Sequence, residues 1–336
     1  MMNGKMNAVP FPYKLIASLA VFAAAFVAAM IFGAADTSLS DVWNAFTDPT
    51  TSKTASMLYE LRLPRGLGAA LVGAALGVPG AIMQGMTRNP LADPGLLGLT
   101  AGANAALAAA MALLPSANYF SITIACFIGA AAGVLLVFGI GTMKRGGFSP
   151  LRIVLAGAAV SAFLTAAAEG IGIFFKVSKD VSMWTAGGLS GTSWSQIQLI
   201  APFILIGIAA SIFCSRQLTI LSLNEEVAVG LGQNIAKTKA VLFLVIIILA
   251  GSSVALVGNM AFIGLMIPHI VRWLVGTDYR FILPISAIFG AAFMLAADTL
   301  ARTISAPYET PVAAIVSLLG LPFFLFIVHK GGRAFS

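Results

Sequence analysis

Long runs of apolar residues recur along the chain, and short polar segments separate them. Each run is close to twenty residues, the length that a helix needs to cross a bilayer. None of them alternates strictly between apolar and polar positions, and lipid offers no partners to the backbone, so helices are the expected spanning structure. We predict ten membrane spans, at about 15–35, 66–86, 96–114, 120–142, 151–175, 196–214, 240–258, 260–278, 281–300 and 311–329.

Two of these spans have unusual features. The run 260–278 is the least regular, because Pro268, His269 and Arg272 lie within it or near its end. The first run follows Lys5 and Lys14, as the apolar stretch of a signal peptide would, but it is longer than such a stretch and lacks a convincing cleavage site. We expect it to remain as a span.

Composition supports an all-α polytopic membrane protein. The chain has 336 residues, of which 59% are hydrophobic and 9% are charged, whereas soluble domains carry roughly 25% charged residues. No linker rich in proline or serine divides the chain, so we expect one transmembrane domain over residues 1–336. Small residues at four-residue spacing, such as Gly73 with Gly77 and Gly129 with Gly133, favour closely packed helices.

The distribution of basic residues predicts the orientation. With the N-terminus inside, inner segments hold 13 of the 19 Lys and Arg residues and outer segments hold 6. Cytoplasmic loops carry this excess in membrane proteins, so both termini are expected to be cytoplasmic. The net charge of +7 follows from the same bias and requires no nucleic-acid partner.

One inner polar segment, about 216–239, has its own helical pattern. Its apolar residues are loosely spaced like one helix face, and two glycines then interrupt it. This predicts a short helix, a glycine turn and a second helix on the cytoplasmic side, and a solvated loop is the alternative. The apolar residues are Leu218, Leu221, Leu223, Val227 and Leu231, and the glycines are Gly230 and Gly232.

The sequence contains no recognisable catalytic or energy-converting motif. There is no P-loop, no zinc-protease motif and no nucleophile elbow, and the two histidines are far apart. Cys126 and Cys214 lie in apolar runs and are expected to pack as small hydrophobes. We therefore expect no enzymatic activity, no metal and no cofactor.

Two acidic residues lie within predicted spans, Glu169 and Asp298. Intramembrane acids are candidates for ion coupling, so a secondary transporter driven by protons or sodium is an alternative function. Both residues are expected near the outer ends of their helices, and Asp298 is four residues from Arg302, a spacing that favours an ion pair. A structural role is the simpler reading of both.

Five motifs occur in order along the chain. Together they resemble the permease family of iron-siderophore and vitamin B12 ABC importers (FecCD/BtuC-like), and the resemblance covers nearly the whole sequence. The stretch "VSMWTAGGLSGTSWSQI" (181–197) is most similar to Gram-positive ferric-hydroxamate (ferrichrome-type) permeases of the FhuG-like kind. The motifs are "LRLPR" (61–65), "RNPLADPGLLGLTAGA" (88–103), "LRIVLAGAA" (151–159), "EVAVGLG" (226–232) and "FIGLMIPHIVRWLVGTDYR" (262–280).

The resemblance implies a type II ABC importer permease in the plasma (inner) membrane, with about ten helices per subunit. It implies a second permease subunit, which we expect to be a distinct paralogue forming a heterodimer. Two cytoplasmic ATPase subunits would drive alternating access, and an extracytoplasmic binding protein would deliver the iron-siderophore complex. The same permease type also carries vitamin B12 or haem, which remain alternatives to a ferric hydroxamate.

The resemblance also assigns roles to residues. Arg62, Arg65 and Arg302 occupy positions where outward-facing arginines receive glutamates of the binding protein, a role that suits the guanidinium fork. The alternative is that they cap helix ends or meet lipid headgroups. The coupling segment that would dock in the ATPase comprises Glu225, Glu226, Ala228, Leu231 and Gly232.

The stretch "RNPLADPGLLG" corresponds to the inner gate in this family. Asn89, Pro90 and Leu91 match gate residues, Arg88 is expected to anchor at the inner face, and Asp93 to cap the next helix near Gly95. A rigid turn without gating is the alternative. The opposite lip is expected at Ser149, Pro150 and Leu151, His269 is expected to be structural, and Tyr279 receives no role because the family often has histidine there.

Overall fold

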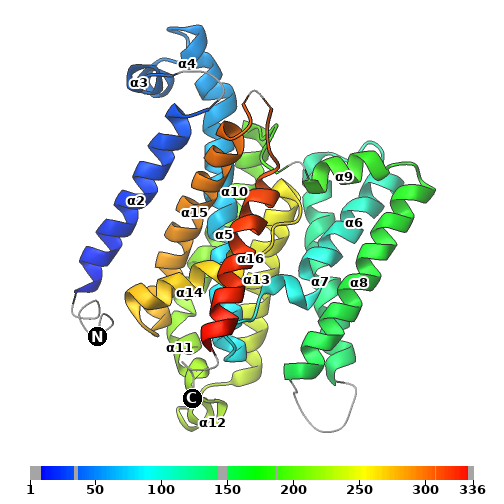
Figure 1. Cartoon of the computed structure of the whole chain (residues 1–336). Helices are drawn as coiled ribbons and strands as arrows, with labels where there is room; N and C mark the ends of the chain where they lie inside the picture. Colours follow the sequence, from blue (N-terminus) through cyan, green and yellow to red (C-terminus); the bar gives the residue numbers. More distant parts are fainter. Residues whose placement is uncertain (1–8, 34–36, 143–149, 187, 307, 332–336) are drawn as a thin grey trace.

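The computed structural model describes residues 9–33, 37–142, 150–186, 188–306 and 308–331, and these contain helices and no strands (Figure 1). Helix α2 starts and α16 finishes at the end of the molecule that carries α12, which we call the α12 end. The opposite end carries α3 and is called the α3 end. The elements are α2 (Phe11–Ile31), α3 (Leu39–Thr47), α4 (Lys53–Met57), η1 (Leu58–Arg62), α5 (Leu63–Thr87), η2 (Pro94–Leu97), α6 (Leu99–Leu113), α7 (Tyr119–Thr142), α8 (Pro150–Phe174), α9 (Ser178–Ala186), α10 (Trp194–Phe213), α11 (Ser215–Leu223), α12 (Glu225–Gly230), α13 (Ile235–Val257), α14 (Ile263–Val275), α15 (Tyr279–Thr303) and α16 (Val312–Gly331).

The helices match the ten predicted spans. Within the described residues, eight helical segments are long and apolar enough to cross a membrane. Two shorter apolar helices, α6 and α14, correspond to the predicted spans 96–114 and 260–278. The prediction of a polytopic all-α protein is therefore confirmed.

Helix α5 is the central element, and α10, α13, α14 and α15 pack against it (Figure 1). Its glycines permit this arrangement. A Cβ atom on Gly73 would lie 2.0 Å from the carbonyl oxygen of Gly290 in α15, and one on Gly77 would lie 2.7 Å from that of Ser286. Small residues let helix backbones approach where lipid supplies no hydrophobic driving force, and the close packing that the glycine spacing favours is present at this contact.

Helices α6, α7 and α8 form a second group at one side of α5 (Figure 1). Gly102 of α6 lies against Gly129 of α7, where a Cβ would come within 2.1 Å of a carbonyl oxygen. Gly133 similarly lies against Gly98. The predicted pair Gly129 and Gly133 is therefore also a helix contact, and this group is held together by close backbones.

The α3 end differs from the prediction. Helix was expected from about residue 66, but a continuous helical segment runs from Lys53 to Thr87. Pro64 lacks an N–H group, so it leaves one backbone acceptor without its usual helical donor. The chain accommodates this with a π turn at η1, where Leu63 N donates to Leu58 O. The helix of the second span therefore extends beyond the predicted boundary.

Helix α14 follows an extended segment. Gly258 ends α13 with φ 73°, Phe262 has φ 67°, and residues 259–261 between them are not helical. Inside α14, Pro268 cannot donate to the carbonyl of Gly264, its partner one turn earlier. The buried Gln84 of α5 replaces that donor, because its Nε2 lies 3.3 Å from Gly264 O and 3.2 Å from Leu265 O.

Candidate functional site

Arg62 connects the ends of two membrane helices. Its side chain is only 8% exposed. Its Nη1 donates to Met30 O at 2.8 Å, to Ile31 O at 3.1 Å and to Thr37 Oγ1 at 2.9 Å. The last carbonyls of a helix lack intrahelical donors and attract positive charge, so Arg62 stabilises the end of α2 against η1.

Arg65 binds two carboxylates at once. Its Nη2 lies 2.9 Å from Asp298 Oδ1, and its Nε donates to the same carboxylate. Its Nη1 lies 2.6 Å from Glu309 Oε1. Asp298 is almost fully buried whereas the Glu309 side chain is 45% exposed. The guanidinium is therefore paired on its inner edge and on its outer edge.

Arg302 completes this group, which we call the arginine network: Arg62, Arg65, Asp298, Arg302 and Glu309. Arg302 Nε lies 3.0 Å from Asp298 Oδ2, one helical turn away, and Nη2 donates to Ala29 O. The predicted pair of Asp298 and Arg302 is confirmed. Asp298 is held between two arginines, which favours a structural role over that of an ion-coupling acid.

The structure thus brings together the three arginines that the sequence placed at the outer face. It places the guanidinium groups of Arg62 and Arg302 in the protein interior and that of Arg65 behind Glu309. Docking of a binding protein here stays a prediction. Sequence reasoning missed Glu309, because no motif contains it and 244 residues separate it from Arg65.

Glu309 also binds a second loop. Ser190 Oγ donates to its Oε2 at 2.5 Å, from the segment between α9 and α10. Partial burial raises the pKa of the Glu309 carboxyl, but the hydrogen bonds from Arg65 and Ser190 outweigh it, so the net pKa lies below the ordinary value. Glu309 therefore stays ionised while it bridges α5 and this loop.

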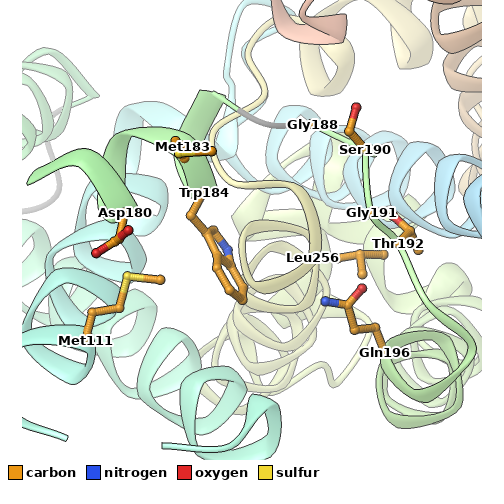
Figure 2. Close-up of a pocket in the computed structure, with 10 residues that line it drawn as sticks. All are labelled: Met111, Asp180, Met183, Trp184, Gly188, Ser190, Gly191, Thr192, Gln196 and Leu256. Carbon is orange, nitrogen blue, oxygen red and sulfur yellow. The ribbon is translucent and has the colours of Figure 1, made fainter. Parts of the chain in front are cut away.

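The loop that contains Ser190 borders a cavity of about 340 Å³ near the α3 end (Figure 2). Gly188 and Gly191 lie on either side of Ser190 with φ of 59° and 81°, conformations that favour glycine. Trp184 of α9 and Gln196 of α10 point into the cavity from opposite walls in Figure 2.

A larger cavity of about 640 Å³ lies next to the turn between α5 and α6. Two predicted gate residues, Asn89 and Leu91, line it. Arg88 before them ends α5 with φ 53°, and Asn89 Oδ1 accepts from Leu91 N, so the turn has a defined shape. The other lining residues are Met83, Thr87, Ala92, Asp93, Gly95, Thr100, Ala101, Asn104, Phe138, Ser161, Thr165, Asn259, Met260, Ala261, Phe262, Leu265 and Phe324.

The wall of this cavity, which we call the polar cavity, offers free hydrogen-bonding capacity. Asn104 Oδ1 of α6 and Ser161 Oγ of α8 are buried and have no hydrogen-bond partner within the described residues. Asn259, on the extended segment before α14, is exposed to it. Because unpaired buried polar groups are costly, these atoms suit a cavity that contains water or a polar ligand.

The other predictions for residues around the polar cavity have mixed outcomes. Asp93 accepts from Gly95 N and caps η2, as predicted. Pro90 lies in the same turn but is absent from the cavity lining. Ser149 lies outside the described residues, and Pro150 and Leu151 begin α8, the helix that carries Ser161. Gating by these residues stays a prediction.

The predicted coupling segment is helical. After α11, Asn224 caps the short helix α12 through Glu226 N, and Gly232 then turns the chain with φ 77° toward α13. Ala228 is buried, whereas Val227, Val229 and Leu231 are exposed at the tip. The predicted short helix and glycine turn are therefore present, the alternative of a solvated loop does not hold, and apolar side chains are exposed here.

Glu225 fixes this helix to its surroundings. Lys239 Nζ of α13 donates to Glu225 Oε1 at 2.7 Å, and Arg88 Nη2 lies 3.9 Å from the same oxygen. The hydrogen bond from Lys239 lowers the pKa of the Glu225 carboxyl against a smaller effect of burial. Glu225 therefore links the α12 end to the turn that borders the polar cavity.

His269 and the two cysteines line neither cavity. His269 is buried and its ring packs against Trp273 and Phe323. Cys126 is buried and Cys214 is partly buried, and both are free thiols. Among the residues that the structure describes, no cluster of His, Cys, Asp and Glu could hold a metal ion.

Comparisons with known proteins identify the fold. The chain is 44% identical to the iron(3+)-hydroxamate import system permease protein FhuB of Bacillus subtilis, over 95% of this chain and 83% of FhuB. It is 42% identical to the Fe(3+)-citrate import system permease protein YfmD (89% of each) and 34% identical to the iron(3+)-hydroxamate permease FhuG (83% of this chain, 85% of FhuG), both of B. subtilis.

A solved structure of a metal-chelate type ABC transporter in an inward-facing conformation covers 96% of this chain and all of its own, with a TM-score of 0.80 and 26% identity. The predicted ABC importer permease fold is therefore confirmed. Permeases of this kind are membrane proteins and are not themselves enzymes. Residues 21–330 match the model of the FecCD transport family, so the chain belongs to the FecCD transport family.

Proposed function

We propose that the chain is one of two permease subunits of an ATP-driven importer for ferric hydroxamates. The observation that carries the transport role is the polar cavity, whose wall joins the turn Asn89–Leu91 to α8 and the segment before α14. A bulky chelate of mixed polarity requires a wide path with few strong contacts, since tight binding would slow its release. Unpaired amide and hydroxyl groups in an otherwise apolar wall suit this requirement.

Exposed apolar side chains on two helices of the chain support a second permease subunit. Exposed apolar residues of α8 (Phe163) and α16 (Leu318, Leu321 and Leu325) occur on helices that also border the polar cavity. Exposed apolar side chains of this kind suit a contact with lipid or with another protein. We propose that a paralogous permease subunit covers it, with the whole chain, residues 1–336, acting as one transmembrane domain.

The two ends of the molecule suit different partners. The exposed tip of α12, with Val227, Val229 and Leu231, would bind a cytoplasmic ATPase subunit. The arginine network at the α3 end would receive carboxylates of an extracytoplasmic binding protein. This assignment places both chain termini in the cytoplasm and the α3 end outside the plasma membrane, in agreement with the distribution of basic residues.

Hydroxamate is the proposed substrate class because FhuB and FhuG, both named for hydroxamate import, are relatives over most of the chain. Ferric citrate is the competing cargo, since YfmD is nearly as similar. The secondary-transporter alternative loses support from Asp298, which is bound by Arg65 and Arg302.

The test is uptake by the complete complex, purified with its partner subunits and reconstituted with its binding protein. We expect ⁵⁵Fe-labelled ferric hydroxamate to accumulate with ATP and to stop with vanadate, and ferric citrate to accumulate much more slowly. Uptake that needs no ATP and collapses when the proton or sodium gradient is abolished would overturn the ATP-driven role. A preference for citrate would overturn only the substrate class.

A further inference from the structure

We propose that Glu309 is a resident competitor for the docking site: its carboxylate occupies Arg65 until a carboxylate of the binding protein displaces it, and displacement releases the Ser190 loop. The inference rests on the proposed docking role of the arginine network. It adds a residue that sets docking affinity and a route from docking to the cavity in Figure 2.

The first step is the geometry at Arg65. Its inner edge, Nε and Nη2, is bound to Asp298, which is 1% exposed and also paired with Arg302. An incoming carboxylate therefore cannot reach that edge without opening the protein interior. Nη1 is the remaining edge, and Glu309 Oε1 lies on it at 2.6 Å.

The second step is accessibility. The Arg65 side chain is 12% exposed, whereas that of Glu309 is 45% exposed. The exposed member of an ion pair leaves at a lower cost than a buried one, because water solvates it once the two groups separate. Glu309 is therefore the removable partner of Arg65, and Asp298 is the fixed one.

The third step is the connection to the loop. Glu309 holds Arg65 with Oε1 and Ser190 with Oε2, so the same carboxylate serves both contacts. When Glu309 leaves Arg65, it loses the cation that keeps it in place beside Ser190. Gly188 and Gly191 on either side of Ser190 supply backbone freedom for the loop to move.

The fourth step is the consequence for the cavity near the α3 end. Ser190, Gly191 and Thr192 line it on one side, and Trp184 lines it on the other (Figure 2). Thr192 is buried, with its hydroxyl donated to Leu189 O. Movement of the Ser190 loop would therefore expose Thr192 and widen this cavity when the binding protein is seated.

The test of the loop contact is cysteine labelling in the assembled complex. Thr192→Cys is introduced after Cys126 and Cys214 are replaced by alanine, and its reaction with a membrane-impermeant maleimide is timed. We expect Glu309→Gln to raise the labelling rate several-fold, and Ser190→Ala to do the same by removing only the loop contact. Glu60→Gln, an exposed acid on η1, is the matched control and should leave the rate unchanged. Equal rates in all four backgrounds would overturn the release of the loop.

Competition is tested by measuring how tightly the assembled complex binds its own binding protein. That binding protein is first captured on the tagged complex and then purified. We expect Glu309→Gln to tighten binding about two- to fivefold, the scale of an exposed ion pair, while Arg65→Ala weakens it. If Arg65→Ala weakens docking but Glu309→Gln leaves the affinity unchanged or lowers it, the competitor role fails and the docking role stands. If Arg65→Ala has no effect, the docking role itself fails.

Discussion

Gly80 of α5 and Gly264 of α14 touch through their backbones: a Cβ atom on Gly80 would lie 1.8 Å from the carbonyl oxygen of Gly264. Gln84, one turn further along α5, donates to that same oxygen. The two residues thus hold a short, proline-containing helix against the central one. The contact leaves no space for a side chain.

We therefore expect Gly80→Ala to destabilise the chain by about 3 kcal/mol, the upper part of the usual range for overpacking, because a rotamer change cannot relieve a backbone contact. Thermal unfolding of the purified chain in detergent measures this. Gly139→Ala is the matched control, since a Cβ there meets nothing within 4 Å. It should be neutral or slightly stabilising. Equal melting temperatures for the two variants would contradict the contact.

Asp298 is the shared anion of the arginine network. Asp298→Asn leaves Arg65 and Arg302 without a buried counter-charge, which costs about 3–5 kcal/mol when one partner of a buried pair is removed. We expect a lower melting temperature and poor recovery of folded chain by size-exclusion chromatography. Glu60→Gln is the control, because it removes one acidic group at the α3 end without touching the arginine network. A variant as stable as the parent would show that Asp298 is dispensable.

The tip of α12 provides a test of ATPase binding. Val229 and Leu231 are 60% and 65% exposed, so aspartate at either position should not disturb the fold of the chain. We expect the double variant V229D/L231D to reduce co-purification of the ATPase subunit by about tenfold, equivalent to 1.4 kcal/mol. Ser222→Asp on α11 is the control for added charge. Full retention of the ATPase would place its binding site elsewhere.

The contact between Glu225 and Lys239 predicts that the stability of α12 depends on pH. The pKa of Glu225 is lowered by the hydrogen bond from Lys239, so this contact stabilises α12 fully above the ordinary pKa of 4.5. The stabilisation is lost as the pH falls below that value through the lowered pKa. Amide-exchange protection factors of residues 225–230, measured from pH 7 to pH 3, should fall across this window. Glu225→Gln should abolish the step and Glu226→Gln should keep it. A step that persists without Glu225 would assign it to another group.

The polar cavity can be filled from α8. Ser161→Phe places an aromatic ring where Ser161 Oγ has no partner within the described residues. If chelate passes here, we expect uptake to fall by about tenfold or more, which corresponds to 1.4 kcal/mol in the transport barrier. Assembly with the other subunits should be unchanged. Leu135→Phe on the exposed face of α7 is the control. Normal uptake by the filled variant would exclude this route.

The spans and the helix contacts were predictable because they follow from local pattern. Hydrophobic runs predicted ten helices, and four-residue glycine spacing predicted the contacts of Gly73 and Gly129. The ordered motifs predicted the family. The π turn at η1 was not predicted, because the residues before Pro64 mix charged, polar and apolar types and lack the apolar pattern that marks a span.

The candidate site was predicted only in part. The motif LRLPR identified Arg62 and Arg65, the resemblance to the family added Arg302, and helix spacing identified the pair of Asp298 and Arg302. Their burial, and the contacts that Glu309 makes with Arg65 and Ser190, depend on segments that are distant in sequence, and no motif contains Glu309. Gln84 was missed for the same reason, since its role depends on a proline 184 positions away in the sequence. Gln84 donates to the carbonyl oxygens of Gly264 and Leu265 in the helix that contains this proline.

The extended segment from Gly258 to Phe262 has a consequence for solvation. Peptide groups outside a helix are tolerated among membrane spans only where protein surrounds them or water reaches them. Asn259 and Ala261 are exposed and border the polar cavity. We therefore expect water to reach this strip of backbone, so that the polar cavity is hydrated and any molecule that enters it replaces bound water.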